Sequence, residues 1–290
     1  QGAITADGGV PPYLWALAGG SLPNGLGLDP VTGVISGSSS GAGPFSFTVQ
    51  VSDLAGAIFS RQFSLTVAAP AMPTLSLGSV PEATSAAQQV MVDLNLEAGY
   101  PIPIAGQVRI NFVPDPAIGL DDPAVQFASG GRSVSFTIPA NSTRPMSPIA
   151  FQTGSVAGTI ELQIVPNGAP GLSRSVKVVR SAPIIRNLSV VRNANGFDLR
   201  LSGLSPSREL TRATVRWTGT GLDTTEVNVP LDSVANAWYR STASAQFGSQ
   251  FSLTLPFTVQ GDVNAIQSAT LTVSNAEGAS SALTVDFTGR

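Results

Sequence analysis

The sequence predicts an all-β protein built from three tandem Ig-like, Greek-key β-sandwich domains. Of its 290 residues, 42% are hydrophobic but only 11% are charged, less than half the usual charged fraction of a soluble domain. Turn-forming residues are plentiful, with 30 Gly and 22 Pro. Apolar and polar residues alternate repeatedly at period two, the pattern of strands with one buried face. Turn clusters separate these runs at a spacing of roughly 8–12 residues, which is typical of sandwiches.

The first domain is predicted over residues 1–70. Three clusters of Gly, Pro, Asn and Asp come first, and these residue types supply the backbone angles of tight turns. Two strands follow, and we expect them to form a hairpin around the turn at Asp53–Gly56. The apolar residues that share a face of these strands are Phe45, Phe47, Val49 and Val51, then Phe59, Phe63, Leu65 and Val67, with Arg61 on the same side.

Four motifs in this domain occur in order at a family-like spacing: Gly8–Trp15, Leu22–Leu28, Asp29–Gly37 and Phe47–Asp53. On these motifs the domain resembles the bacterial "putative Ig" modules, which are related to the dystroglycan-type cadherin-like domains. The resemblance implies an Ig-like sandwich that is repeated in long extracellular proteins and is sometimes linked with calcium. Such modules begin with a further strand, whereas only residues 1–6 precede the first motif turn here. We therefore expect an N-terminally truncated domain whose first strand is missing or short.

The second and third domains are predicted over residues 73–181 and 182–290. A Pro-bearing linker of small residues, Ala68–Pro73, precedes the second domain, and Ser181–Pro183 marks the start of the third. Each domain carries about seven alternating runs, enough for a complete sandwich. In the second domain the alternation includes one continuous strand from Val90 to Leu96.

Composition excludes several kinds of chemistry. The chain has no Cys and no His, which removes disulfides, thiolate catalysis, zinc fingers and imidazole-based sites. Its net charge is −3, without a basic stripe, so nucleic acid is not expected as a partner. Carboxylates are dispersed and catalytic residues are not identified, so we expect no enzyme activity. No apolar run is long enough for a membrane-spanning helix, so we expect no membrane insertion of this segment.

The most acidic loop contains Asp115, Asp121 and Asp122. One hypothesis is a calcium site, because a hard cation prefers carboxylate oxygens. The alternative is a solvated loop in which each Asp forms an Asx turn before Pro. We favour the loop, since three carboxylates do not complete the six to eight oxygens that calcium takes. Calcium is therefore a possible but not a favoured ligand, and no other cofactor is expected. The high frequency of Asp in β-turns likewise favours a turn role for Asp29 over a role as a metal ligand.

A second candidate site is Trp238, Tyr239 and Arg240, which we place in a loop, together with Arg212. An aromatic platform flanked by Arg can stack a sugar or hold a peptide carboxylate. The alternative is that Trp238 closes the end of the sandwich, and buried aromatic residues are the more common case.

We interpret the chain as a non-enzymatic, extracellular structural and adhesion segment of a bacterial surface or secreted protein. Its expected partners are other proteins or surface glycans, and we expect a monomer. The alternative function is a carbohydrate-binding ancillary module of a larger secreted enzyme, with Trp238 and Tyr239 as the sugar platform.

Overall fold

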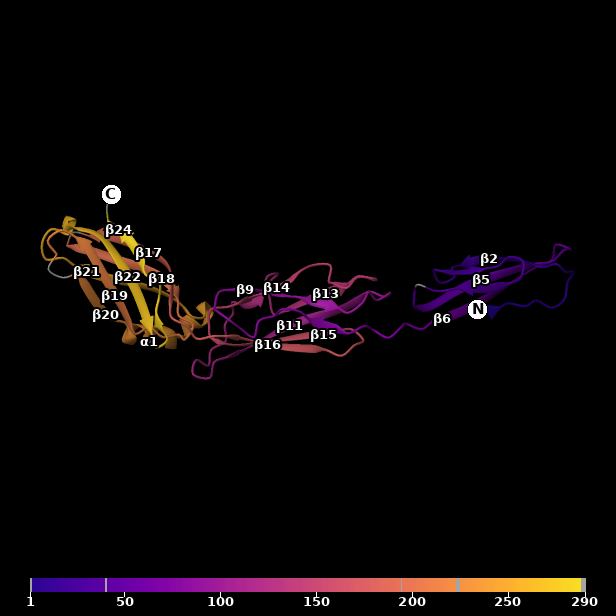
Figure 1. Cartoon of the computed structure of the whole chain (residues 1–290), viewed down its shortest axis with the longest axis horizontal. Helices are drawn as coiled ribbons and strands as arrows, with labels where there is room; N and C mark the ends of the chain where they lie inside the picture. The colour runs from indigo at the N-terminus through magenta and orange to yellow at the C-terminus, as the bar shows by residue number, and fades with distance from the viewer. Residues whose placement is uncertain (1, 40, 194, 223–224, 288–290) are drawn as a thin grey trace. The chain divides into compact units, whose positions relative to one another are not determined.

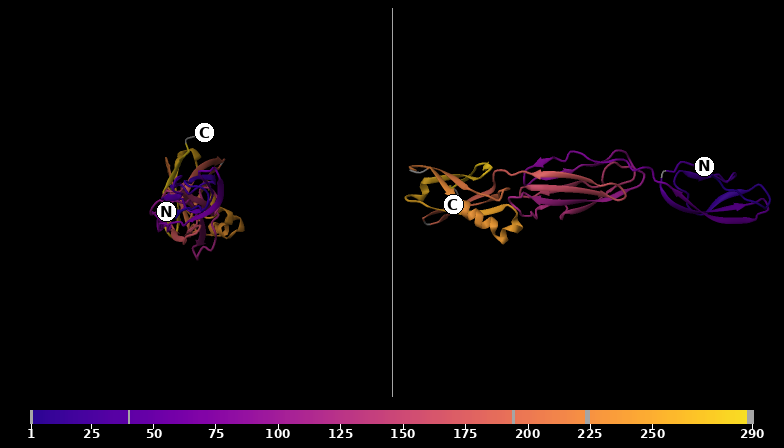
Figure 2. Two further views of the ribbon diagram at one scale, coloured as in Figure 1. Left: turned by 90° about the vertical axis from the view of Figure 1, so that its right-hand side faces the viewer. Right: turned by 90° about the horizontal axis from the view of Figure 1, so that it is seen from below.

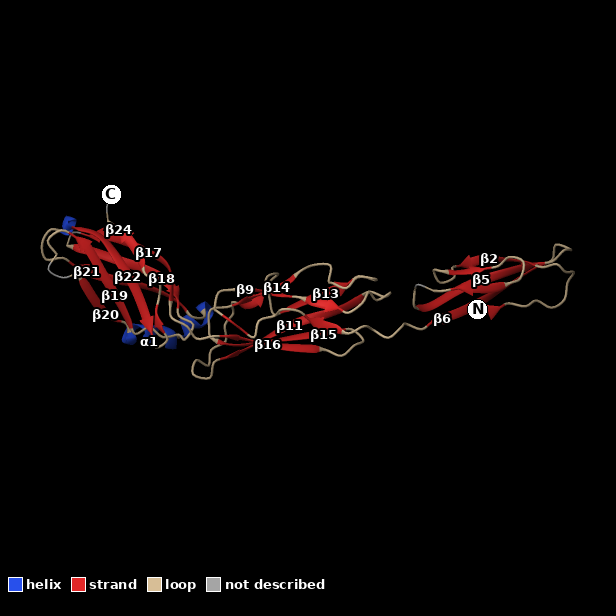
Figure 3. Cartoon of the chain, in the orientation of Figure 1, coloured by secondary structure: helices blue, strands red, loops and turns tan. Residues whose placement is uncertain are grey.

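The computed structural model describes residues 2–39, 41–193, 195–222 and 225–287. Residues 1 and 288–290, at the ends of the predicted first and third domains, lie outside the described residues. Nearly all regular elements are strands, drawn red in Figure 3. The chain divides into two compact units. One comprises Gln1–Ser76, Leu94–Ala105 and Thr137–Met146, and the other comprises the remaining residues. The predicted boundaries near residues 70 and 181 stay predictions.

The N-terminal part of the first unit contains two three-stranded sheets, ordered β1-β4-β3 and β2-β5-β6. Trp15, Leu22, Phe47 and Val49 are buried between them and form a small core. The predicted alternation on β5 is thus confirmed, and β5 and β6 form the predicted hairpin. The strands are β1 (Gly2–Ala3), β2 (Leu14–Gly20), β3 (Leu26–Leu28), β4 (Val34–Gly37), β5 (Gly43–Ser52) and β6 (Ile58–Val67). Figure 1 shows them in indigo to violet.

Two details of this sandwich refine the expectations. A first strand is present but only two residues long, and it pairs with β4. The pairing of β6 with β5 puts Phe59, Arg61 and Phe63 on one face, as predicted. Phe59, however, is 67% exposed, because β6 is the outer strand of its sheet. Asp29 accepts hydrogen bonds from the backbone N–H groups of Val31 and Thr32, which confirms it as a turn residue.

The middle of the chain forms a five-stranded sheet, β13-β11-β15-β16-β8, a three-stranded sheet, β12-β14-β9, and a β10-β7 pair. Within the larger sheet, β8 runs parallel to β16 and the long β11–β15 pair is antiparallel. Their bounds are β7 (Leu75–Leu77), β8 (Ala83–Thr84), β9 (Gln89–Val92), β10 (Leu94–Leu96), β11 (Ile104–Pro114), β12 (Val125–Phe127), β13 (Ser133–Ile138), β14 (Ile149–Thr153), β15 (Gly158–Pro166) and β16 (Leu172–Val178). We call this the second sandwich.

The prediction of one strand from Val90 to Leu96 is wrong. The segment makes two strands, β9 and β10, which belong to different sheets. The change occurs at Asp93, whose backbone carbonyl accepts a hydrogen bond from the Gly78 N–H at 2.7 Å. Alternation continues through the change of partner, so the pattern alone gives one strand where the fold has two.

The C-terminal sandwich, the third, packs the sheet β17-β18-β21 against β20-β19-β22-β23, with β24 also paired to β22. The chain crosses between the two sheets from β18 to β19, from β20 to β21 and from β21 to β22, in the Greek-key order of Ig-like and fibronectin type III sandwiches. Its core gathers Phe197, Leu199, Trp217, Leu271 and Val273 from both sheets. The strands are β17 (Ile184–Asn193), β18 (Gly196–Leu204), β19 (Arg212–Gly219), β20 (Glu226–Pro230), β21 (Gln250–Thr258), β22 (Ile266–Asn275), β23 (Gly278–Ala279) and β24 (Leu283–Asp286).

Between β20 and β21 the chain is helical, which corrects the expected loop. The α-helix α1 (Asp232–Arg240) is followed by the 3₁₀ helix η1 (Thr242–Phe247), and a short η2 (Val263–Ala265) precedes β22. Figure 2 (right) shows α1 as an orange coil beside the strands of the third sandwich. Leu231, Ala235 and Tyr239 recur at helical spacing and are buried in the core. Among the described residues, every helix is too short or too polar to cross a bilayer.

Candidate functional site

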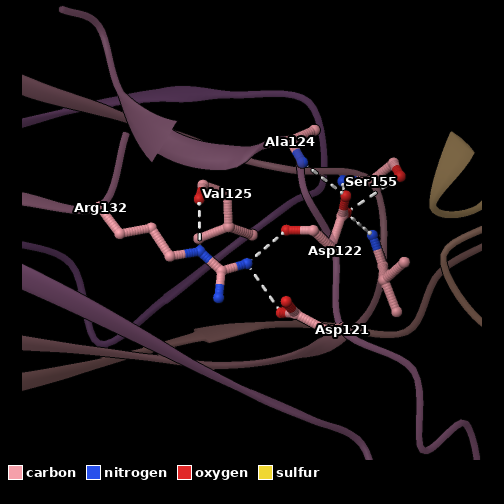
Figure 4. Close-up of polar contacts among 7 residues, drawn as sticks. Asp121, Asp122, Ala124, Val125, Arg132 and Ser155 are labelled. Carbon is pink, nitrogen blue, oxygen red and sulfur yellow. Dashed lines mark hydrogen bonds and ion pairs between the residues drawn. The ribbon is translucent and has the colours of Figure 1, made fainter. Parts of the chain in front are cut away.

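The acidic loop leads into β12 and is held by Arg132, as Figure 4 shows. The guanidinium donates to Asp121 Oδ1 at 2.7 Å and to the Asp122 backbone carbonyl at 2.8 Å. Its Nε also donates to the Val125 carbonyl at 3.2 Å. The Asp121 side chain is 62% exposed, so this ion pair is a surface one and contributes little stability.

Asp122 has the opposite environment, because its side chain is completely buried. Its Oδ1 accepts the Ala124 N–H at 3.0 Å in an Asx turn. Its Oδ2 accepts the Val156 N–H at 2.8 Å, the Ser155 hydroxyl at 3.0 Å and the Ser155 N–H. A buried carboxylate is tolerated only when its oxygens are hydrogen-bonded, and this one is. The prediction of Asx turns is confirmed here, but the prediction of a solvated loop is wrong for Asp122.

Ser155 extends this network into the third sandwich. Its Oγ accepts the Ser249 N–H at 2.9 Å, and its carbonyl accepts the Ser249 hydroxyl at 2.6 Å. Nearby, the Ala157 N–H donates to the Pro206 carbonyl at 2.9 Å. Ser155 and Ser249 are both buried, so these bonds are shielded from competing water. Direct hydrogen bonds therefore join the second sandwich to the third, and the residues that form them lie in one compact unit.

Two glycines, one from each sandwich, leave room for this contact. A Cβ on Gly154 would lie 2.6 Å from Asp122 Oδ2, and a Cβ on Gly248 would lie 2.8 Å from Asp122 Oδ1. Both residues also have a positive φ, +70° and +60°, which other residues adopt at a cost. The backbone of the third sandwich can approach the buried carboxylate only because Gly248 has no side chain.

Tyr239 and Arg208 continue the network inside the third sandwich. The Tyr239 hydroxyl donates to the Ser249 carbonyl at 2.9 Å, and the Arg208 guanidinium lies 4.9 Å from the Tyr239 ring centroid. Arg208 also donates to Ser244 Oγ at 2.8 Å and to the carbonyls of Gly248 and Tyr239. We call Asp122, Ser155, Arg208, Tyr239, Ser244 and Ser249 the junction network.

Electrostatics in the junction network follow from its burial. Burial lowers the pKa of Arg208, while the neighbouring Tyr239 and the Asp122 charge act in the opposite direction. Burial also raises the pKa of the Tyr239 hydroxyl, which stays a neutral donor. Asp122, in the second sandwich, thus acts on the pKa of Arg208 in the third.

The remaining predicted site residues are not gathered into one site. Asp115 forms a two-pronged ion pair with Arg180, with distances of 2.7 and 2.9 Å, and this pair lowers the pKa of the Asp115 carboxyl. Arg212 is exposed on β19, and Arg240 is exposed in the last turn of α1. Trp238 packs against the core and donates its Nε1–H to the Gln250 carbonyl at 2.9 Å.

Within the part of the chain that the structure describes, no three acidic side chains come close enough together to hold a metal ion. Asp115, Asp121 and Asp122 each have different protein partners, Arg180, Arg132 and Ser155. Of the predicted residues the structure thus brings together Asp122 and Tyr239, which sequence analysis assigned to two separate sites.

Sequence analysis missed Arg208, Ser155 and Ser249 as members of this site. Arg208 stands close in sequence to Arg212, and only the fold decides which of the two reaches Tyr239. Serines give no pattern of their own, so Ser155 and Ser249 carry no signal. Helix α1 had a signal, since Leu231, Ala235, Trp238 and Tyr239 follow the i, i+4, i+7, i+8 spacing of a helix face.

Residues 1–68 match the family "Putative Ig domain". This confirms the resemblance of the first domain to that family, and the match covers less than a quarter of the chain. A search of curated proteins finds no match.

Solved structures that match the chain include the chicken CNTN1 FN1–FN3 domains, at 9% identity, covering 84% of this chain and 77% of that one, with a TM-score of 0.25. Another is surface layer protein SbsC, domains 4–9, at 12% identity, covering 98% and 40%, with a TM-score of 0.22. A third is SGBP-B of Bacteroides ovatus in complex with a mixed-linkage heptasaccharide, at 14% identity, covering 94% and 59%, with a TM-score of 0.23. The β-sandwich assignment rests on the sheets described above.

Proposed function

We propose that the chain is a non-enzymatic structural and adhesion segment of an extracellular bacterial protein, in which the second and third sandwiches act as one stiff element. The observation that carries this proposal is the junction network. Its most buried charged group, Asp122, is bonded entirely to protein donors, and Ser155 links it to Ser249 of the next sandwich. Asp122 and Tyr239, which sequence analysis weighed as ligand-binding candidates, are engaged in protein hydrogen bonds on the two sides of the junction. The Ig-like module at residues 1–68 supports an adhesion or binding role.

Stiffness of the junction is testable with spin labels, because the chain contains no cysteine. We expect Ser175→Cys and Ser252→Cys, both at exposed positions on β16 and β21, to give a narrow distance distribution by double electron–electron resonance. Ser249→Ala should broaden it, because its hydroxyl no longer bonds the second sandwich. Ser173→Ala, exposed on β16, is the matched control and should leave the distribution unchanged. A broad distribution in the otherwise unchanged chain would refute the stiff element. Mixing the labelled protein with an excess of unlabelled protein suppresses the contribution of spin-label pairs on different molecules.

The rival function, carbohydrate binding, has a separate test. The Trp238 indole is only partly accessible, packs near Phe247 at 5.9 Å between ring centroids, and has its N–H engaged by Gln250. We therefore expect no specific signal on a glycan array. Specific binding that Trp238→Ala abolishes and that Ser173→Ala, exposed on β16, leaves unchanged would favour the carbohydrate-binding module instead.

A further inference from the structure

The first sandwich has an open side between its two sheets. A groove of about 460 Å³ is lined on one side by residues 3–7 and on the other by Phe59, Arg61 and Phe63 of β6, with Trp15 at its base. Among the described residues of this sandwich, the buried hydrophobic core consists of four side chains. A small core of this kind leaves apolar surface uncovered. Phe59, which lines the groove, is 67% exposed, and Ile58, whose side chain points to the opposite face of β6, is 63% exposed.

The strand beside this groove is also an unprotected edge. β6 is ten residues long and is the outer strand of the sheet β2-β5-β6. Its sequence, IFSRQFSLTV, has one charged residue, Arg61, and no Pro. Long, apolar edge strands with free backbone groups are templates for pairing with another strand.

The direction of the free backbone groups follows from the β5–β6 register. The Asp53 N–H donates to the Ala57 carbonyl, and opposite residues in an antiparallel ladder alternate between bonded and non-bonded pairs. The pairs Val51–Phe59 and Val49–Arg61 are therefore the bonded ones. The β2–β5 pairing agrees with this assignment. Trp15 lies opposite Val51, and its N–H points away from β5 and donates to the Pro30 carbonyl, which leaves the backbone groups of Val51 to β6. Even-numbered residues of β6, from Ile58 to Thr66, consequently direct their N–H and C=O groups outward.

We propose that β6 pairs with β6 of a second copy of this chain, antiparallel about a two-fold axis at Gln62. In this register Phe59 faces the partner's Leu65, Arg61 faces the partner's Phe63, and Ser60 faces the partner's Ser64. Arg61 already lies 5.6 Å from the Phe63 ring centroid within one chain, so each Arg keeps an aromatic face. The two sheets become one continuous sheet, and apolar side chains of the partner cover the mouth of the groove.

Neighbouring registers are less favourable. An axis at Arg61 sets two like charges directly opposite each other, which is destabilising. An axis at Phe63 leaves the exposed Ile58 without a partner and sets Arg61 against Leu65. An axis midway between two residues would pair even-numbered residues, whose N–H and C=O groups point outward, with odd-numbered residues, whose groups are already bonded to β5. The side-chain sequence of β6 is therefore self-complementary about Gln62, as an isologous interface requires. This second-copy pairing departs from the monomer expected from the sequence and is independent of the junction network.

The test uses the full chain, which has no cysteine of its own. We expect sedimentation to give twice the monomer mass with rising concentration. A short bifunctional thiol reagent should couple Gln62→Cys into a covalent dimer, because residues facing each other in a bonded pair lie about 5.5 Å apart. Ser64→Cys is the matched control, since its two copies would be four residues out of register, roughly 13 Å apart, and should couple poorly. Equal coupling of both variants would overturn the register, and a monomer at all concentrations would overturn the proposal.

A backbone variant separates loss of pairing from loss of fold. Ser60→Pro removes an N–H that points away from β5, and Pro is tolerated on an edge strand in that position. We expect this variant to be monomeric, with the slow hydrogen exchange of β2 and β5 in the folded domain retained, while Ser60→Thr still dimerises. A dimer that persists in Ser60→Pro would place the interface elsewhere and refute the proposal.

Discussion

Asp122→Ala is expected to lower the free energy of unfolding of the second sandwich by at least about 3 kcal/mol. The change removes a fully buried carboxylate and leaves its donors, the N–H groups of Ala124, Ser155 and Val156, without their acceptor. Each buried donor left without a partner costs roughly 1–3 kcal/mol. The loss should be largest in the strands on either side of Ser155, β14 and β15.

Hydrogen exchange measured by mass spectrometry is the suitable readout, because the tryptophans at positions 15, 217 and 238 lie outside the second sandwich. We expect faster exchange in peptides from Ile149–Thr153 and Gly158–Pro166. Asp121→Asn is the matched control, since its exposed ion pair with Arg132 contributes roughly 0–1 kcal/mol. If Asp121→Asn accelerates exchange as much as Asp122→Ala does, burial of Asp122 is not the cause.

Arg208→Ala is expected to destabilise the third sandwich by about 2–4 kcal/mol. Its guanidinium bonds Ser244 and the carbonyls of Gly248 and Tyr239, and a hydrogen bond to a charged group contributes about 1.5–3 kcal/mol net of solvent. The cost of burying the Arg208 charge offsets part of their sum. It also stacks on the Tyr239 ring. Arg208→Lys should recover only part of the loss, because an ammonium group has neither the fork of donors nor the flat face of a guanidinium.

Urea unfolding followed by tryptophan fluorescence measures this effect, since Trp217 and Trp238 both report on the third sandwich. Arg240→Ala is the control, because Arg240 is exposed in the last turn of α1, where a positive charge gains a modest stabilisation of about 0.3–1 kcal/mol from the helix dipole. We expect its midpoint to move much less than that of Arg208→Ala. Equal shifts in the two variants would show that positive charge near α1 matters and the specific contacts do not.

The fold class could be predicted from the sequence because a strand with one buried and one solvent-exposed face alternates apolar and polar residues. Strands such as β11, with alternating buried Val108, Ile110 and Phe112, are therefore found by pattern alone. The same pattern joined β9 to β10, since alternation does not record which sheet a strand enters. Helix α1 was missed because Trp238 and Tyr239, which carry part of its helical spacing, were considered only as a sugar-binding platform or as aromatic residues that close the end of the sandwich.

The site was less predictable, for a physical reason. Asp122 and its neighbour Asp121 look alike in sequence, yet one is completely buried and the other is mostly exposed. What separates them is the position of Ser155, which lies 33 residues further along the chain. A bond of that kind depends on the packing of whole sheets, so residue type and local spacing predict an Asx turn but not its burial.

The junction network also has a consequence for how this protein can be divided or rearranged. A break near residue 181, the natural place to separate two sandwiches by sequence, would strip Ser249 from Ser155 and open the surroundings of the Asp122 carboxylate to water. Any sandwich that replaces the third one must also keep a glycine at the position of Gly248, since a side chain there would collide with the Asp122 carboxylate. Recombination between genes should therefore exchange the second and third sandwiches together. Either sandwich expressed alone should expose the junction surface and tend to aggregate.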